Sequence, residues 1–409
     1  MTKPCIYFVG KPYPHFRAHE LIKKLGFGVG ILHDKNVPLN KPENYDDIIE
    51  VDFSSNQSVI DSLPAHSSSI KGLVCTYENY IIAKALLGDY LGLPSITMES
   101  AEISTDKYLM RQAFMKANTS ISPNFGLAND LSEVRALSQK LRYPLILKPT
   151  NLVKSLLVLR CNNETELFSN FEFAKQQLEG LYNKHRIYNR KPQLIVEEYI
   201  IGKTCSVAAF VDQKGIPHFC EGIVSLINAQ DLGVDDNFIY GRILPANFDD
   251  QLTARLFDVS RQGIAALQMT SSPAHIELIY NDHQVKLIEI GARIGGYRPR
   301  MYEMSYNIDL IEQELKLALG QTPILDGEPA AFSAVFELFP HQEGLFQSIE
   351  GKVDTAAFRY FSVKAGLGDK VGPAKRGYKA AAVIIVSSPD EVEFKELCDR
   401  VNQLKVRVN

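Results

Sequence analysis

Residues 274–300 read AHIELIYNDHQVKLIEIGARIGGYRPR, and this stretch decides how the rest of the chain is interpreted. Two apolar segments, His275–Tyr280 and Val285–Ile290, flank a polar link, which is the pattern of a β-hairpin. Each predicted strand carries one acid inside its apolar run, Glu277 in the first and Glu289 in the second. An ionised carboxylate in apolar surroundings is costly unless a cation compensates it, so the two acids predict a bound cation.

The two acids suit a hard divalent ion. Side chains alternate between the faces of a strand, so His275 shares a face with Glu277. Arg293 shares a face with Glu289 if the extended chain continues that far. Mg²⁺ takes one or two carboxylates and leaves its other positions to phosphate and water. We therefore expect metal and phosphate to meet beside this hairpin.

Two glycines follow the arginine, Gly295 and Gly296, and residues of this type let the backbone approach a ligand closely. The alternative interpretation is an amphipathic hairpin whose acids face solvent and whose Arg293 pairs with one of them. The hairpin by itself does not separate the two interpretations, because short motifs recur by chance.

Length and composition place the chain among multidomain globular proteins. Its 409 residues predict about two to four domains. With 45% hydrophobic and 22% charged residues, the composition is that of an ordinary globular protein. A net charge of −4 argues against a bulk nucleic-acid binder and against a membrane-surface protein.

The cysteines and the apolar segments indicate a compartment. The 6 cysteines are scattered without a CxxC pair or a zinc spacing, which favours buried thiols in a reducing environment over disulfides. The N-terminal apolar run is too short for a signal peptide, and no segment approaches the ~18 apolar residues of a membrane span. We expect a cytoplasmic protein without a membrane partner.

Residues 1–100 alternate between strand-like and helix-like segments, which predicts a parallel sheet flanked by helices. The expected strands are Cys5–Val9, Gly28–Leu32, Asp47–Asp52 and Gly72–Cys75, and the expected helices are His15–Leu25, Ser58–Leu63 and Tyr80–Leu91. The first turn, residues 10–14, reads GKPYP and lacks the GxGxxG of dinucleotide-binding domains, so an NAD-dependent oxidoreductase is disfavoured.

Residues at strand ends of such sheets are the usual ligand contacts. The candidates are Lys11, His15, Glu78 and Asn79. The alternative is that Glu78 caps the helix that follows it and that the others are ordinary loop residues.

Two lysines come next in the chain. Residues 100–105 read as a linker, after which Thr105 or Asp106 is expected to cap a helix that begins near Lys107. A buried strand then ends in Lys148. A lysine at a strand end, with its amine in a cleft, is a point charge for a phosphate oxygen, and one inside an apolar run is rarely unpaired. The alternative for Lys107 is a solvated helix residue.

The loop after this strand, residues 150–159, reads TNLVKSLLVL and contains no glycine. Lys154 and Ser155 offer a cation and a hydroxyl to a phosphate, but a loop without glycine does not reach positive φ cheaply. Farther on, a buried strand from Gln193 ends in Glu197-Glu198-Tyr199-Ile200, with Gly202 next.

The second half of the chain reads as strands and three further helices, Asp249–Leu267, Leu310–Leu319 and Pro389–Leu404. Cys205–Asp212 and Pro217–Leu226 predict a hairpin, and Asn228–Arg242 a long polar loop. Arg242 is expected to make a surface salt bridge, with phosphate or a substrate carboxylate as the alternative partner. From Thr322 onward the pattern becomes that of a small α+β unit.

Four motifs in this order resemble the ATP-grasp superfamily, and among its members the carboxylate–amine ligases of the L-amino acid ligase and carnosine-synthase-like type. The motifs are Thr-Asp-Lys (105–107), Leu-Lys-Pro (147–149), Val-Glu-Glu-Tyr-Ile-x-Gly (196–202) and Glu…Glu-x-Gly-x-Arg-x-Gly-Gly (277–296). The resemblance implies an ATP-grasp fold behind a Rossmann-like N-terminal domain, with a small α+β C-terminal cap. The implied boundaries are 1–100, 101–192 for the small subdomain, 193–325 for the large subdomain, and 326–409 for the cap.

The resemblance also implies the ligands and the residues that hold them. Lys107 and Lys148 would reach the ATP phosphates, and Glu197 with the backbones of Glu198 and Ile200 would bind adenine. Glu277 and Glu289 would hold Mg²⁺, for which Mn²⁺ can substitute. Arg293 would hold an acyl phosphate, and the substrate-side residues would be His275, Arg293, Gly295 and Gly296.

The implied reaction is a ligation in two steps. A substrate carboxylate attacks the γ-phosphate, and an amine then attacks the acyl phosphate, so the partners are a small carboxylate and a small amine. Gly291, where many relatives have asparagine, favours amino-acid or peptide substrates. Purine-pathway ligases, carboxylases and an ATP-binding protein with degenerate catalysis stay open, the last because of the glycine-free loop. A homodimer is an expectation at family level.

Overall fold

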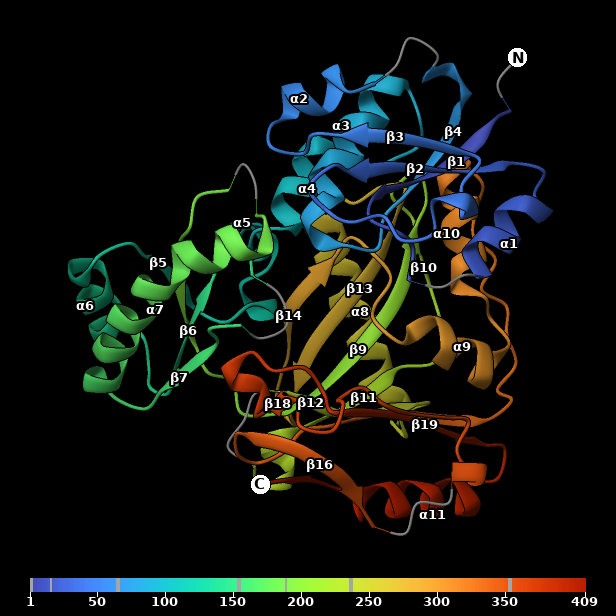
Figure 1. The fold of residues 1–409 in the computed structure, drawn as a ribbon. Coiled ribbons are helices and arrows are strands. Elements are labelled where there is room, and N and C mark those ends of the chain that lie inside the picture. The colour runs from blue at the N-terminus through green and yellow to red at the C-terminus, as the bar shows by residue number, and fades with distance from the viewer. Residues whose placement is uncertain are drawn as a thin grey trace.

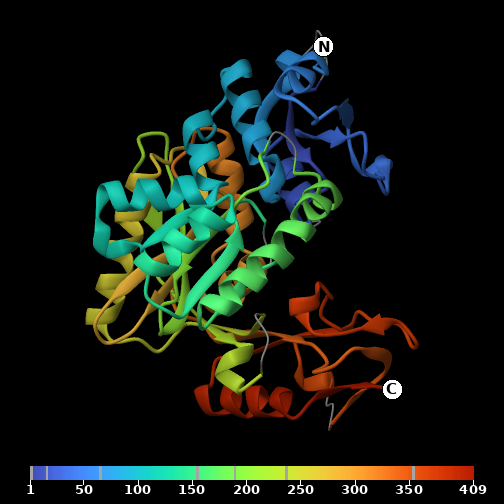
Figure 2. The ribbon, with the colours of Figure 1, turned by 90° about the vertical axis from the view of Figure 1, so that its left-hand side faces the viewer.

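The computed structural model describes residues 3–14, 17–63, 67–152, 156–187, 190–234, 238–351 and 355–409. Figure 1 shows three lobes: an N-terminal lobe at the top, a small lobe at the left, and a large sheet that runs from the centre to the bottom. Figure 2, turned by 90°, shows the C-terminal strands and helix lying below the other two lobes. No helix in the described ranges is long and apolar enough to cross a membrane.

The N-terminal lobe is built on a four-stranded parallel sheet in the order β3-β2-β1-β4. The strands are β1 (Cys5–Gly10), β2 (Gly28–Asp34), β3 (Asp47–Val51) and β4 (Ile70–Val74), and the helices are α1 (Arg17–Lys24), α2 (Asn56–Asp61) and α3 (Ile81–Leu91). The parallel sheet predicted from the alternating pattern is therefore confirmed. The candidate residue His15 lies outside the described residues.

The small lobe is a four-stranded antiparallel sheet in the order β5-β8-β6-β7. Its strands are β5 (Phe125–Ala128), β6 (Leu145–Pro149), β7 (Leu159–Cys161) and β8 (Leu194–Glu198), packed against α6 (Leu131–Lys140) and α7 (Glu164–His185). The boundary predicted at 192/193 assigned β8 to the large subdomain. The structure differs, because β8 pairs with both β5 and β6.

The third lobe is a nine-stranded sheet in the order β14-β13-β9-β11-β12-β15-β19-β17, with β10 paired to β9. The strands are β9 (Lys203–Val211), β10 (Pro217–Phe219), β11 (Val224–Asn228), β12 (Ile239–Leu244), β13 (Ser272–Tyr280), β14 (Val285–Gly291), β15 (Phe332–Leu338), β17 (Tyr360–Val363) and β19 (Ala382–Ser388). The expected cap at 326–409 thus continues this sheet, because β15 pairs with β12 along four residues. A small sheet of β16 (Gly344–Glu350), β18 (Lys370–Val371) and β20 (Lys405–Val408), together with α11 (Glu391–Asn402), completes the C-terminal region.

Three local predictions were wrong. Residues expected to form a linker form α4 (Met98–Ser104), because the Thr97 side chain caps the first turn and Ala101 is buried. The second strand of the predicted hairpin, Pro217–Leu226, is broken into β10 and β11. The polar loop expected at Asn228–Arg242 contains β12, whose residues pair with β11 and β15 on either side.

The predicted hairpin of the opening stretch is confirmed as β13 and β14. Helix α8 (Asp250–Ala266) packs behind it, and Gly263 makes this packing close, since a Cβ there would lie 2.6 Å from Leu287 Cδ1. Helix α5 (Lys107–Ala117) packs against α8 beside β14, and α9 (Arg298–Tyr306) and α10 (Leu310–Ala318) follow the hairpin in the chain. The hairpin therefore lies where the lobes meet.

Candidate active site

The two hairpin acids lie side by side and are largely shielded from solvent. Glu277 and Glu289 are direct partners in the β13–β14 register, and opposing residues of an antiparallel pair project from the same face. Their side chains are 23% and 25% exposed. His275 shares this face, with its Nε2 3.2 Å from Glu277 Oε1. The alternative in which the acids face solvent does not describe this hairpin.

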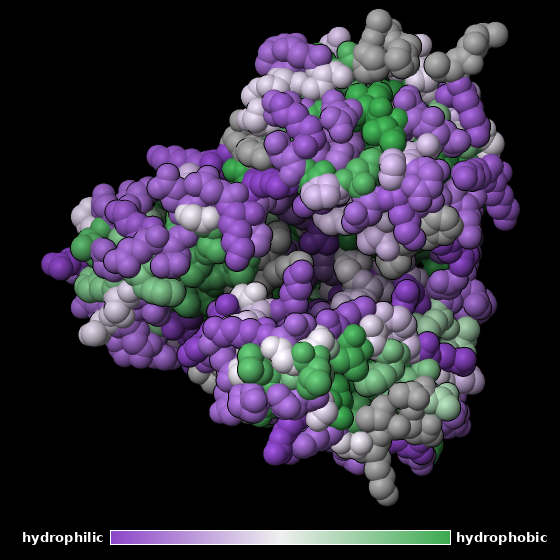
Figure 3. Space-filling view, viewed as in Figure 1, coloured by the Kyte–Doolittle hydropathy of each residue, from purple (hydrophilic) through white to green (hydrophobic). Residues whose placement is uncertain are grey.

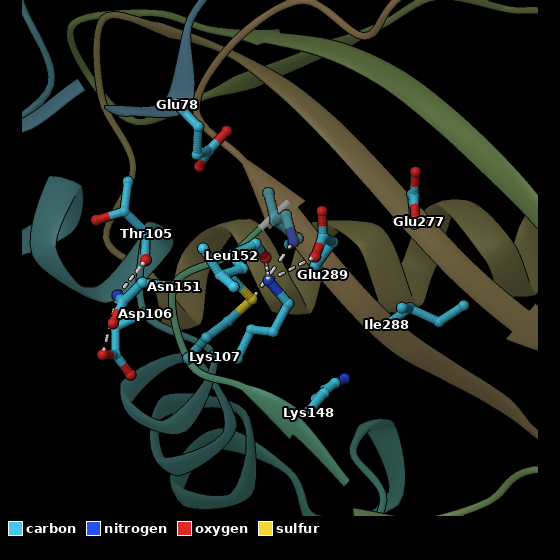
Figure 4. Close-up of polar contacts among 12 residues, drawn as sticks. Glu78, Thr105, Asp106, Lys107, Lys148, Asn151, Leu152, Glu277, Ile288 and Glu289 are labelled. Carbon is cyan, nitrogen blue, oxygen red and sulfur yellow. Dashed lines mark hydrogen bonds and ion pairs between the residues drawn. The ribbon is translucent and has the colours of Figure 1, made fainter. Parts of the chain in front are cut away.

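Lys107 reaches Glu289 from the first turn of α5. Asp106 is the helix N-cap, and its side chain accepts the N–H groups of Tyr108 and Leu109. The Lys107 Nζ lies 3.2 Å from Glu289 Oε2 and donates to the Leu152 carbonyl at 2.9 Å, as Figure 4 shows. Lys107 is thus a partly buried cation on a hairpin acid, and the alternative of a solvated helix residue is wrong.

The charges of this pair support each other. Burial alone would lower the pKa of Lys107, but the neighbouring Glu289 outweighs it and the pKa is raised. Burial opposes ionisation of Glu289, but Lys107, Lys148 and Arg293 lower the pKa of this carboxyl to about 2. Both groups are therefore charged at neutral pH, which is the state that a metal and a phosphate require.

A second cluster lies deeper, between the small lobe and the hairpin. Lys148 Nζ is 2.8 Å from Glu197 Oε2, and Arg111 Nε is 2.9 Å from Glu197 Oε1. All three side chains are almost fully buried, at 7% exposure or less. Burial, together with Arg111 and Lys107 nearby, lowers the pKa of Lys148 to about 8, although Glu197 opposes the shift.

Arg111 was missed by the sequence analysis. Besides Glu197, its guanidinium donates to the Ile288 carbonyl of β14 at 2.7 Å, so it connects the small-lobe strand β8 to the hairpin. The signal was the spacing of Lys107 and Arg111, which are four residues apart and therefore share one face of a helix. That face of α5 is directed at both clusters.

Arg293 lies beyond the end of β14, which ends at Gly291, so it is not on the extended strand that the shared-face argument assumed. Its Nε instead binds Glu78 Oε2 of the N-terminal lobe at 2.8 Å. Burial raises the pKa of Glu78, although Arg293 opposes this, while Glu78 and Glu289 raise the pKa of Arg293 against the effect of burial. Glu78, one of the candidate ligand contacts at the strand ends, is thereby brought to the hairpin (Figure 4).

The residues after Arg293 form a close turn around His275. A Cβ at Gly295 would lie 2.5 Å from His275 Nδ1, so only glycine fits there, whereas nothing lies within 4 Å of a Cβ at Gly296. The His275 Nδ1 is buried without a hydrogen-bond partner, and burial lowers the pKa of this ring despite Glu277. His275 is therefore held neutral beside the hairpin acids.

A buried arginine that the sequence analysis did not single out follows the turn. The Arg298 guanidinium donates to Ser206 Oγ at 2.7 Å and to the Gly296 carbonyl at 3.2 Å. Burial and the nearby Arg242 lower its pKa to about 10. Arg242 itself is not at the surface as expected: it pairs with Glu337 at 2.9 Å, and both side chains are mostly buried.

The remaining candidates are placed as follows. Lys154 and Ser155 lie outside the described residues. Leu157, in the same glycine-free loop, has φ 54°, a left-handed conformation that is strained for a residue with a side chain. The Glu198 N–H donates to the Asn124 carbonyl at 2.9 Å, and Ile200 lies in the irregular segment after β8. Their contacts with adenine stay predictions.

Two N-terminal candidates lie at the edge of the same region. The Lys11 Nζ lies over the rings of Tyr77 and Tyr80, 5.6 and 5.8 Å from their centroids. Asn79 donates to the His185 carbonyl at 2.7 Å, which joins the N-terminal lobe to the end of α7. These contacts account for both side chains without a ligand.

The space between the lobes is lined by polar and apolar side chains together. One hollow is lined by Glu78, Thr105, Lys107, Asn151, Glu289 and Gly291, and a larger one beside it by residues that include Asn56, Asn79 and Arg190. Figure 3 shows the surface hollowed at the junction of the three lobes, with purple side chains inside. Within the described ranges, no group of three or more His, Cys, Asp or Glu side chains is arranged to hold a metal by itself.

The donor set nevertheless fits Mg²⁺. Two carboxylates on one face, with cations of the opposite lobe next to them, match an ion that takes one or two carboxylates and completes its shell with phosphate and water. Glu277 and Glu289 are therefore the residues that can hold the ion, and Lys107 and Lys148 those that can hold phosphate.

A comparison with protein families matches the part of the chain that carries most of these residues. Residues 141–299 match the model described as an ATP-grasp domain. The chain contains an ATP-grasp domain. The resemblance inferred from the four motifs is thereby confirmed.

The chain has curated relatives at low identity. It is 24% identical over 297 residues to the uncharacterized protein y4rH of Sinorhizobium fredii, covering 71% of this chain and 57% of that protein. It is 23% identical over 308 residues to an alanine–anticapsin ligase of Bacillus subtilis, covering 71% of this chain and 64% of the relative. The chain thus matches about three fifths of the length of these relatives.

Among solved structures, the chain is similar to an L-amino acid ligase from Bacillus licheniformis. The TM-score is 0.80 at 18% sequence identity, and the match covers 100% of both chains. At this identity the similarity concerns the fold. It confirms the predicted ATP-grasp fold with a parallel-sheet N-terminal domain.

Proposed function

We propose that this protein is an ATP-dependent carboxylate–amine ligase that forms an amide bond through an acyl phosphate and releases ADP and phosphate. The observation that carries the proposal is the juxtaposition of the paired acids Glu277 and Glu289 with Lys107 and Lys148, within an ATP-grasp domain. Phosphoryl transfer depends mainly on positioning and charge stabilisation, so these groups suffice without a protein nucleophile.

ATP and Mg²⁺ are the ligands we assign to this site. Glu277 and Glu289 would hold the ion, which supplies charge neutralisation for the transferred phosphoryl group. Lys148 would turn from Glu197 to a phosphate oxygen, and Lys107 would do the same from Glu289. The backbones of Glu198 and Ile200 would receive adenine, while the Glu197 side chain is held by two cations.

Arg293 would bind the reacting carboxylate and its acyl phosphate. Its planar guanidinium suits two oxygens at once, and Glu78 keeps it oriented at the N-terminal side of the hairpin. His275, buried and held neutral, orients Glu277 through its Nε2. Gly295 lets the chain pass His275 closely, which brings the backbone of the turn next to the substrate.

Amino acids or short peptides are the substrates we favour. The support is the similarity to the alanine–anticapsin ligase and to the L-amino acid ligase fold, together with Gly291 in the metal motif. Purine-pathway ligases and carboxylases share the fold but not this support. The partners are then a small carboxylate and a small amine, and a homodimer stays a prediction.

A pairwise screen tests the proposal. The purified protein is incubated with ATP, Mg²⁺ and all pairs of the common amino acids, and phosphate release is measured, with mass spectrometry of the active wells. We expect phosphate and ADP in equal amounts in a few wells, each with a product that has lost one water relative to its two substrates. Phosphate release without a coupled product, in every well, would contradict ligation.

A second candidate is an ATP-binding protein with little turnover, and the strained Leu157 in the glycine-free loop favours it. A residue in this conformation costs of the order of 1–3 kcal/mol, which the closure of the loop over phosphate has to offset. Tight ATP binding in calorimetry, without ADP formation in the amino-acid screen or with other carboxylates and amines, would support this candidate.

A further inference from the structure

The Glu197 carboxylate is bound by two cations at once. Lys148 Nζ lies 2.8 Å from Oε2, while Arg111 spans both oxygens, with Nε 2.9 Å from Oε1 and one NH2 3.2 Å from Oε2. All three side chains are almost fully buried. The carboxylate therefore has one counter-charge more than it requires.

This surplus matters because Lys148 is needed elsewhere. In the proposed ligase, its ammonium has to leave Glu197 for a phosphate oxygen. If Lys148 were the sole partner of Glu197, that movement would leave a buried carboxylate without a counter-ion, which is strongly unfavourable. Arg111 removes this obstacle, because its charge stays paired with the same carboxylate in either position of the lysine.

We propose that Arg111 is a positioning residue that neutralises Glu197 and thereby releases Lys148 to the nucleotide phosphate. The inference rests on the proposed ATP site and deepens it. The second contact of Arg111, the hydrogen bond of 2.7 Å to the Ile288 carbonyl, fixes the guanidinium to the strand that carries Glu289. Arg111 thus holds the nucleotide-side strand β8 and the metal strand β14 at a set distance.

A purely structural role for Arg111 predicts a different experimental result. If Arg111 only filled space between β8 and β14, its loss would weaken the fold whether or not Glu197 carries a charge. If it acts by neutralising Glu197, its loss is harmful only while that charge is present. Removal of the charge by Glu197→Gln then compensates for the loss of Arg111, which is testable in a double mutant.

The test measures the Kd for ATP with Mg²⁺ by isothermal titration calorimetry in Arg111→Met, Glu197→Gln and the double variant. We expect Arg111→Met to weaken ATP binding at least tenfold and the double variant to bind within about threefold of Glu197→Gln alone. Lys116→Met, an exposed cation on the same helix, is the matched control and leaves the Kd unchanged. A folded double variant that binds no better than Arg111→Met overturns the inference.

Arg111→Lys keeps the test valid if the methionine variant does not fold. Lysine retains the charge but does not span both oxygens and the Ile288 carbonyl, so we expect a Kd between those of the wild type and Arg111→Met. A Kd equal to that of the wild type overturns the inference. Circular dichroism and thermal unfolding establish that each variant is folded.

A pH profile adds a readout that packing does not move. The charged groups facing Lys148 are Glu197 of β8, Arg111 and Lys107 of α5, and Glu289 of β14. Loss of the Arg111 charge raises the pKa of Lys148, so the pH above which ATP binding weakens shifts upward in Arg111→Met; an unshifted profile contradicts the inference.

If the wild type does not bind ATP, the proposed function fails as well. If it binds ATP but the double variant shows no recovery, only the role of Arg111 fails.

Discussion

The two ion clusters of the site, the β8 cluster of Arg111, Lys148 and Glu197 and the hairpin cluster of Lys107, Glu277 and Glu289, are built in opposite ways. In the β8 cluster one carboxylate has two cations, and all side chains are almost fully buried. In the hairpin cluster two carboxylates share one lysine and one neutral histidine, and about a quarter of each acid is exposed.

The difference indicates which ligand each cluster of the proposed site suits. The β8 cluster has an excess of positive charge and is closed to solvent, and in the proposed ligase Lys148 would turn from it to the phosphates of ATP. The hairpin cluster has an excess of negative charge at the edge of a hollow, so it is ready for a metal ion. The two excesses are complementary, and Lys107 connects them.

The largest expected effect comes from removing charge from the hairpin cluster. Glu289→Gln should reduce ADP formation by roughly 10³-fold, the typical cost of losing one group that stabilises transition-state charge. The fold should remain, because Lys107 keeps its hydrogen bond to the Leu152 carbonyl. Steady-state ADP formation and thermal unfolding measure both effects. Wild-type turnover would refute the assignment of Glu289.

The next largest effect is expected when Lys148 is removed from the β8 cluster. Lys148→Ala should reduce kcat/KM for ATP by about 100-fold, since a charge-assisted hydrogen bond to a buried anion is worth up to about 3 kcal/mol. Arg111 stays on Glu197, so the Tm should change little. Lys140→Ala, an exposed lysine on α6, is the control. A large fall in Tm with unchanged kinetics would mean that Lys148 stabilises the fold and does not bind ATP.

Arg293 tests the substrate side of the hairpin cluster. Arg293→Ala should lower kcat for ligation by roughly 30-fold while the Kd for ATP changes less than threefold, because the proposed partner of the guanidinium is the acyl phosphate rather than the nucleotide. The variant also leaves Glu78 without its buried partner, so Arg293→Lys serves as the milder control. An unchanged kcat would remove Arg293 from the chemistry.

The pH dependence of ATP binding separates the clusters without mutation. Lys148, with a pKa of about 8, is charged below that value and loses its proton above it. The Kd for ATP should therefore be flat from pH 6 to about 7.5 and rise toward tenfold per pH unit above about 8. Calorimetry on the wild type and on Lys148→Met measures this. The same rise in Lys148→Met would assign it to another group.

The smallest expected change strengthens the hairpin cluster. Gly291→Asn introduces an amide oxygen next to Glu289, and its Cβ would lie 3.4 Å from Glu78 Oε2, a tolerable contact. We expect Mn²⁺ to bind about threefold to tenfold more tightly in the presence of ATP, as an additional oxygen ligand allows. Electron paramagnetic resonance of free Mn²⁺ gives the affinity, and Gly180→Asn, at an exposed position of α7 with open space for a Cβ, is the control. Weaker binding would mean that the metal does not approach this side of the hairpin.

Much of the fold could be predicted from the sequence because periodicity is local. The parallel order of β1–β4, the β13–β14 hairpin and the Asp106 cap all follow from alternation, turn residues and capping chemistry. What failed depended on distant partners. The pairing of β15 with β12 extends the large sheet across the expected cap boundary, and β8 joins the small sheet, and neither pairing leaves a trace in its own segment.

The site divides in the same way. The acids Glu277 and Glu289 and the lysine Lys148 stood out because charges inside apolar runs are unusual, and Lys107 stood out through the Thr-Asp-Lys motif. Arg111 did not stand out, since an arginine on a helix is ordinary until its partners Glu197 and Ile288 are known. The pairing of Arg293 with Glu78 joins residues that are 215 positions apart, so the two residues could be predicted as candidates only separately.

The most direct test of the central claim follows the oxygen of the substrate carboxylate. The carboxylate substrate identified by the amino-acid screen is labelled with ¹⁸O and incubated with ATP, Mg²⁺ and the amine, and the released phosphate is analysed by mass spectrometry. An acyl-phosphate ligase transfers one ¹⁸O atom to each phosphate, and this is the result we predict for the wild type. Unlabelled phosphate at full amide yield would contradict attack of the carboxylate on the γ-phosphate.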